Sequence, residues 1–389
     1  MKNLKNMEIS KFPEFFNKIA DIIEQARKHV GRTADLTMCI TYYEVGRIIV
    51  EQEQGGKTRA EYGTGLLNDL SEFLTNLYGR GFSETNLRYA RKFFQTYEKQ
   101  IQQLLTAELK VKKQQSLDVK SSYLTISEFS PKTQILSNIF KVSWTHYVVL
   151  MRIKNPDERN FYELESANQG WSVEELQRQY NSSLYERLAL SRNKNEVLRL
   201  AQEGHTLEKP ADMFKNPLVL EFLGLEEREV YSESDLETAI TSKLQKFLLE
   251  LGKGFLFEAR QKRFTFEEEI FWIDLVFYNR LLQCYVLIDL KTEKLKHQDL
   301  GQMQMYVNYF DRFVKTEHEK PTVGILLCKE KKDSIVQLTL AEDANIYASE
   351  YSLYLPDKTL LQQKLSEWIQ EYEEAQNILE TANEIPAID

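Results

Sequence analysis

Two short stretches decide the fold class of the C-terminal part of the chain: Phe271-Trp-Ile-Asp274-Leu-Val-Phe277 and Val286-Leu-Ile-Asp289-Leu-Lys291. Both are rich in β-branched and aromatic residues, which is typical of strands, yet each has a carboxylate inside it. An unpaired charge is costly to bury in a strand, so each aspartate needs a partner or a function. Because Asp289 and Lys291 are two residues apart, we expect them to project from the same strand face.

The flanking segments complete an α-β-β-β-α-β order. Ser234 is the expected N-cap of a helix that ends at Gly252. Further segments are expected as strands at 255–264, 270–278, 284–290 and 322–328, and as helices at 298–313 and 358–382. This order predicts an α/β domain with a central mixed sheet flanked by helices.

The acids and the lysine suit phosphodiester hydrolysis. Aspartates on adjacent strands can hold Mg²⁺ or Mn²⁺, which prefer oxygen ligands. A bound metal polarises the phosphate and acidifies water, and a lysine can orient that water or help to deprotonate it. A buried salt bridge would explain Asp289 and Lys291 alone. The expected upstream helix adds Glu237, and the downstream helix adds Gln302 and Tyr306, which are four apart and so on one helical face.

Taken together, Asp274, Asp289-Leu-Lys291 and Gln302-Met-Gln-Met-Tyr306 resemble the PD-(D/E)XK nuclease superfamily, and residues 210–375 are similar to its YhcG-type bacterial family. Ile273 stands where the superfamily often has proline. The resemblance implies a restriction-endonuclease-like fold. It also implies a metal site formed by the acids Glu237, Asp274 and Asp289. Lys291 would be the catalytic lysine, and Gln302 and Tyr306 would support the site.

Two polar residues near this centre carry weaker hypotheses. Glu293 would share the strand face of Lys291 and serve as a further ligand, but an exposed turn is the favoured interpretation. His297 is interpreted as a surface residue and not as a metal ligand.

The N-terminal half is mainly helical, and residues 83–97 form its best-defined amphipathic helix. Its apolar arc contains Leu87, Ala90, Phe93, Phe94 and Tyr97. The opposite arc offers three cations and an amide that suit phosphates and base edges, namely Arg88, Arg91, Lys92 and Gln95. A charged arc is more often only a solvated surface. Motifs such as Gly81-Phe-Ser-Glu-Thr-Asn-Leu-Arg88 resemble the helical, winged-helix-like N-terminal domain found with this nuclease family, which implies nucleic-acid binding.

The expected domain division follows these patterns. A helical N-terminal domain spans 1–200, with a polar insertion or linker near 102–133 and a second helical block at 133–200. Residues 201–217 form a connection in which Pro210 and Pro217 interrupt regular structure. The nuclease-like domain spans 218–389 and ends in an acidic helix.

The composition of the chain indicates where the protein is located in the cell and which partners it binds. The net charge is −9, but residues 1–200 carry 29 Lys and Arg against 24 Asp and Glu, whereas residues 201–389 carry 21 against 35. A mildly basic binding half joined to an acidic half fits this asymmetry. The chain has 3 cysteines without a CxxC pair, no membrane-length apolar run and no apparent secretory signal, so we expect a cytoplasmic protein without a membrane partner.

The predicted function is that of a bacterial, Mg²⁺- or Mn²⁺-dependent endonuclease that acts on nucleic acid, with DNA favoured over RNA. The superfamily implies a role in defence or in recombination and repair. A homodimer is favoured, because nucleases that cut both strands are often dimers. Two alternatives are a catalytically silent nucleic-acid-binding protein and a partner-docking subunit of a larger system that uses its acidic tail.

Overall fold

The computed structural model describes residues 13–55, 65–115, 139–190, 194–215, 217–225, 231–341, 344–367 and 369–370. The chain divides into two compact units, Met1–Arg159 and Asn160–Asp389. In the described part of the chain, no helix has the length and apolar character needed to cross a membrane.

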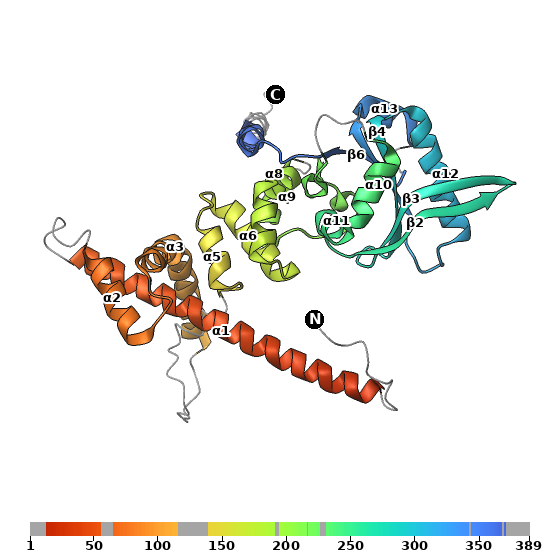
Figure 1. Cartoon of the computed structure of the whole chain (residues 1–389). Coiled ribbons are helices and arrows are strands. Elements are labelled where there is room, and N and C mark those ends of the chain that lie inside the picture. The colour runs from red at the N-terminus through yellow and green to blue at the C-terminus, as the bar shows by residue number, and fades with distance from the viewer. Residues whose placement is uncertain are drawn as a thin grey trace. The chain divides into compact units, whose positions relative to one another are not determined.

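The first unit is helical, as expected (Figure 1). It contains α1 (Pro13–Gly55), α2 (Leu66–Tyr78), α3 (Glu84–Gln115) and α5 (Trp144–Leu150). α1 and α3 pack so closely that a Cβ atom on Gly46 would lie 2.0 Å from the carbonyl oxygen of Ala90. Only glycine therefore allows this approach.

The predicted apolar arc of α3 lies in the core of this unit. Leu87, Ala90 and Phe93 are fully buried, and Phe94 and Tyr97 nearly so. The ring of Phe93 lies 5.0 Å from those of Phe140 and Tyr147, so the arc joins an aromatic cluster with the segment before α5. α3 continues to Gln115, which makes the first part of the polar stretch 102–133 helical. Its Gln and Lys residues are good helix formers, and residues 116–138 lie outside the described residues.

The second unit contains a six-stranded mixed sheet in the order β1-β6-β5-β4-β3-β2. Its strands are β1 (Leu218–Val219), β2 (Phe255–Phe266), β3 (Glu269–Asn279), β4 (Cys284–Lys294), β5 (Val323–Glu330) and β6 (Ile346–Ser352). β2, β3 and β4 are antiparallel neighbours, whereas β4, β5, β6 and β1 run parallel. The predicted mixed sheet is confirmed, but β1 and β6 were not predicted.

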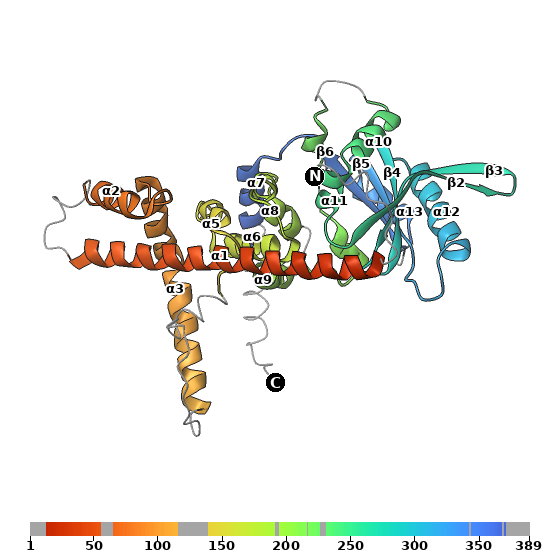
Figure 2. The same cartoon turned by 60° about the horizontal axis from the view of Figure 1, so that its bottom comes forward.

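Helices cover both faces of this sheet (Figures 1 and 2). α10 (Glu233–Ser242) and α11 (Leu244–Leu251) bury Leu236, Ile240 and Phe247 against alternate β4 residues such as Val286. On the other face, α12 (His297–Phe313) packs on Leu287, and α13 (Asp333–Thr339) packs beside it. The alternation of strand side chains thus creates two apolar cores, one on each side.

The helix predicted from Ser234 to Gly252 is wrong in two details. Ser232, not Ser234, is the N-cap, and it forms a capping box with Asp235. The helix is interrupted at Lys243, whose ammonium donates hydrogen bonds to the carbonyl oxygens of Phe222 and Leu223. The break therefore coincides with a contact to a segment 20 to 21 positions upstream.

Residues 160–203 lie in the second compact unit. They form most of α6 (Pro156–Gln169), together with α7 (Val173–Asn181), α8 (Leu184–Ala189) and α9 (Lys194–Glu203). Arg187 of α8 and Glu250 of α11 are both fully buried and pair at 2.7 Å. Arg178 joins the same carboxylate at 3.2 Å. This charge network links helices placed in the N-terminal domain by sequence to the helix that covers the sheet.

Candidate active site at the fork between β3 and β4

The hydrogen-bonded ladder between β3 and β4 ends at a fork. Its last pair is Leu275 with Ile288, so Asp274 and Asp289 are the next residues on the two strands. Beyond this point β3 remains paired with β2, and β4 remains paired with β5. The Asp274 carboxylate stays at the fork, because its Oδ2 accepts a hydrogen bond of 2.8 Å from the backbone N–H of Leu290.

Asp289 and Lys291 contact each other on β4, as their spacing requires. Lys291 Nζ lies 2.9 Å from Asp289 Oδ2 and 3.6 Å from Glu233 Oε2 of α10. The Asp289 side chain is 6% exposed and that of Lys291 is 16% exposed. The lysine therefore remains reachable from solvent, while its acidic partner is buried.

Burial and neighbouring charges both shift the pKa values of Asp289 and Lys291. Burial and the nearby Asp274 raise the pKa of Asp289 to about 7, although Lys291 opposes this shift. Burial lowers the pKa of Lys291, but Asp289, Glu233 and Asp274 together outweigh burial, so the net pKa lies above its usual value. The site therefore keeps a protonated lysine next to acids that repel one another.

Glu237 of α10 joins the same centre through Gln261 of β2. The Gln261 amide Nε2 donates to Glu237 Oε2 at 2.5 Å and to Asp274 Oδ1 at 3.2 Å. Gln261 has a φ of 45°, in the left-handed region that ordinary residues rarely adopt. This backbone strain at a residue whose side chain links two acids points to a functional constraint.

Sequence reasoning missed Gln261, and also missed Glu233 as a partner of Lys291. Gln261 belongs to no motif, and only the strand register reveals it. Its neighbours Arg260 and Lys262 pair with Leu275 and Ile273, which places Gln261 opposite Asp274.

Gln302 and Tyr306 contact each other on α12, where the Gln302 amide donates to the Tyr306 hydroxyl. Tyr306 is buried, whereas Gln302 is exposed. Burial, and then the charge of Asp289, raise the pKa of Tyr306 to about 12. Tyr306 thus lies within the electrostatic range of the Asp289 carboxylate.

The donor set suits a hard divalent cation, because Glu237, Asp274 and Asp289 offer only carboxylate oxygens. Glu237 Oε1 is buried without a hydrogen-bond partner, and Arg260 Nε lies 3.2 Å from it. Among the described residues, however, no three His, Cys, Asp or Glu side chains are arranged closely enough to form a ready metal site. The ammonium of Lys291 and the amide of Gln261 contact these acids in the structure.

Two neighbouring residues lie at the surface. The Glu293 side chain is 76% exposed and pairs with Lys296. His297 begins α12 and is exposed. These placements favour the surface interpretations of both residues.

The four candidate nucleic-acid contacts are all on α3, which belongs to the first unit. Arg88 pairs with Glu84, and Arg91 pairs with Glu53 of α1 at 2.7 Å. Lys92 and Gln95 are exposed. Two of the three cations are therefore engaged with neighbouring acids in this structure.

A mixed sheet with helices on both faces, and an acid on each side of a strand fork followed by lysine, defines a domain of the PD-(D/E)XK nuclease class. Residues 211–366 match the model of the YhcG PDDEXK nuclease domain, and residues 18–187 match that of the DUF1016 N-terminal domain. The chain is 37% identical over 371 residues to "Putative nuclease YhcG" of Escherichia coli (strain K12), covering 94% of this chain and 96% of that protein. The chain belongs to the YhcG family of PD-(D/E)XK nucleases.

Two solved structures are similar to part of the chain. One is a repair endonuclease from Pyrococcus abyssi, with 18% identity and a TM-score of 0.22 over 34% of this chain and 50% of that one. The other is a complex of EndoMS with double-stranded DNA, with 16% identity and a TM-score of 0.23 over the same shares.

Proposed function

We propose that this protein is a divalent-metal-dependent endonuclease that hydrolyses phosphodiester bonds, with DNA as the substrate. The observation that carries the proposal is the meeting of Asp274 and Asp289 at the strand fork, with Lys291 Nζ 2.9 Å from Asp289. A purely structural ion pair would explain Asp289 and Lys291, but it would not explain a second acid at the fork or its link to buried Glu237.

Glu237, Asp274 and Asp289 are the residues that would hold Mg²⁺ or Mn²⁺, and such an ion supplies Lewis-acid polarisation of the phosphate and acidification of water. Water forms a new bond to phosphorus while a bond from phosphorus to a sugar oxygen breaks, and that oxygen gains a proton. Lys291 remains protonated beside Asp289. Its role is therefore to orient the attacking water and stabilise negative charge on the phosphate.

The polar arc of α3 is proposed as a nucleic-acid contact. Exposed Lys92 and Gln95 can reach phosphates or base edges without rearrangement. Arg88 and Arg91 would exchange their carboxylate partners for phosphates. In this proposal the domain division predicted at 1–200, 201–217 and 218–389 separates binding from catalysis.

The decisive experiment is cleavage of mixed plasmid, linear, single-stranded and branched DNA with Mg²⁺ or Mn²⁺. Lys291→Ala should lower the rate by roughly 100-fold or more, since a positioned charge or proton donor contributes about 10² to 10⁴. Lys294→Ala is the matched control, because Lys294 is on the same strand but pairs with exposed Glu330. EDTA should abolish cleavage by the wild type.

Calorimetry separates this proposal from a silent binding protein. The wild type should take up Mg²⁺, whereas Asp289→Asn should take up much less. Binding of DNA without metal uptake, and without cleavage under any condition, would favour the silent nucleic-acid-binding alternative.

A further inference from the structure

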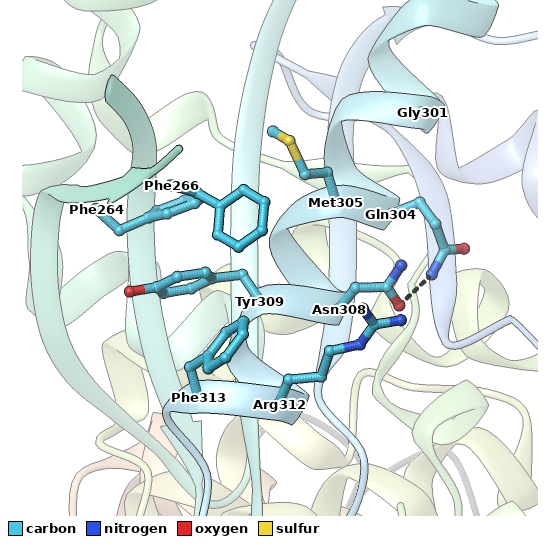
Figure 3. A pocket seen from close by; sticks show the side chains of 9 residues that line it. All are labelled: Phe264, Phe266, Gly301, Gln304, Met305, Asn308, Tyr309, Arg312 and Phe313. Atoms are coloured by element: carbon cyan, nitrogen blue, oxygen red, sulfur yellow. Dashed lines mark hydrogen bonds between the residues drawn. The ribbon is translucent and has the colours of Figure 1, made fainter. Parts of the chain in front are cut away.

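A pocket of about 300 Å³ lies between the outer end of β2 and α12 (Figure 3). Phe264 and Phe266 come from the strand, while Tyr309 and Phe313 come from the helix, and their rings form the apolar wall. The strand belongs to a β2–β3 hairpin that extends beyond the rest of the sheet (Figures 1 and 2).

Two of these aromatic rings contribute little to the core. Phe313 is 62% exposed and Phe266 is 46% exposed, with ring centres 6.2 Å apart. Beneath them, Phe264 stacks on Tyr309 at 4.0 Å. Exposed flat rings beside a rigid stacked pair form a surface on which another planar ring can stack.

The opposite side of the pocket is polar. Gln304 and Asn308 are four residues apart on α12, and the Gln304 amide donates to Asn308 Oδ1 at 3.2 Å. This bond leaves Gln304 Oε1 as an acceptor and the Asn308 amide as a donor for a ligand, a combination that suits the edge of a nucleobase. Arg312 lines the same side, and no ion pair with a carboxylate of the described residues is found for it. It supplies a cation for a phosphate.

One ring contact connects the pocket to the candidate active site. Phe264 meets Tyr306 edge to face at 5.7 Å, and Tyr306 is the hydroxyl partner of Gln302. A strand with a phosphate at the fork could therefore place a nearby base in this pocket.

We propose that this pocket binds one nucleobase that has left its stack, so that the preferred substrate is a nucleic acid with an unpaired nucleotide near the cleaved bond. The idea rests on the proposed nuclease function for the position of the cleaved bond and extends it by naming a substrate class. The volume is at the lower end of small-ligand pockets, which suits a flat ring system. The aromatic wall, the amide pair and the cation match base faces, base edges and phosphate respectively.

The test measures binding in EDTA to fully paired oligonucleotides, to the same duplexes with one unpaired 2-aminopurine, and to single strands, as DNA and as RNA. The wild type should bind the substrate with the unpaired base roughly tenfold more tightly than the paired one, and should quench its fluorescence. Phe313→Ala and Phe313→Leu should lose both effects, whereas Phe313→Tyr should retain them, because stacking requires an aromatic face. Arg312→Gln should weaken binding to all substrates and lower the salt dependence.

Trp272→Ala is the matched control, because Trp272 is an aromatic residue of the same hairpin that is 49% exposed and does not line the pocket. Equal affinity for paired and unpaired substrates, or an equal loss in Trp272→Ala, would overturn the proposal. So would a dimer in light scattering that Phe313→Ala dissociates, since the pocket would then be an interface between copies. Preference for the unpaired base without any cleavage would overturn the nuclease function alone, while cleavage without this preference would overturn the pocket alone.

Discussion

The carboxylate of Asp274 accepts a hydrogen bond of 2.8 Å from the backbone N–H of Leu290, directly beyond the last paired residues of β3 and β4. A side chain thus takes the place of the next rung of the ladder. The bond holds one acid of the proposed metal site at the fork, and it couples the local stability of the strands to the site.

Asp274→Ala should reduce both stability and cleavage, because it leaves the Leu290 N–H without its acceptor. The expected cost is about 1–3 kcal/mol in the free energy of unfolding. Asp274→Asn retains an oxygen acceptor and should be less destabilised, although it should lose cleavage to the same extent. Urea denaturation in EDTA measures stability, and equal destabilisation of both variants would contradict this role of the carboxylate.

Gln261 should act as a positioning residue, because its amide holds Glu237 and Asp274 together. Gln261→Ala and Gln261→Gly should each lower metal affinity or activity by about 10- to 100-fold, the usual cost of losing a residue that orients metal ligands. Glycine relieves the positive φ, so an equal loss in both variants assigns the effect to the amide. Thr265→Ala, at an exposed position of the same strand, serves as the control. Calorimetry measures the metal affinity of each variant. An unchanged metal affinity in the Gln261 variants would show that Gln261 has a purely structural role.

Acid should destabilise the protein through Glu250. Burial raises the pKa of this carboxyl, but the charges of Arg187, Lys215 and Arg178 outweigh burial and lower it to about 2. Because the folded pKa lies below the ordinary glutamate pKa of 4.5, the stabilisation is present above about pH 4.5 and is lost as the pH falls toward 2.

Glu250→Gln should cost about 3–5 kcal/mol at neutral pH, because it leaves buried arginines without their partner. The difference from the wild type should shrink as the pH falls from 4.5 toward 2. Thermal unfolding across this range measures it, and a difference that stays constant with pH would refute the assignment.

Lys92→Ala should weaken binding to duplex DNA irrespective of sequence, and should lower the slope of log affinity against log salt by about 1. The exposed Lys141 of the same unit gives a matched control in Lys141→Ala. Fluorescence anisotropy at several salt concentrations measures both effects. If both variants behave alike, the polar arc of α3 is only a solvated surface.

Much of the fold was predictable from short-range patterns. Apolar and β-branched runs located β2, β3, β4 and β5 to within a few residues, and the spacing of Asp289 and Lys291 placed both on one strand face. The period of α3 identified its buried arc. β6 was missed because its sequence, Ile346-Tyr-Ala-Ser-Glu-Tyr-Ser352, lacks a clear apolar run, and it is a strand through parallel pairing with β5.

The sequence by itself determined the sheet-and-helix class of the second unit, the Asp289–Lys291 pair and the amphipathic α3, since each depends on residues close together in the chain. Only the tertiary structure decided that Asp274 bonds Leu290 at a fork, that Gln261 links two acids, and that Arg187 of α8 pairs with Glu250 of α11. These contacts join residues 13 to 63 positions apart. Such distant residues meet only when the strands pair and the helices pack, so no local pattern of charge or hydrophobicity encodes them.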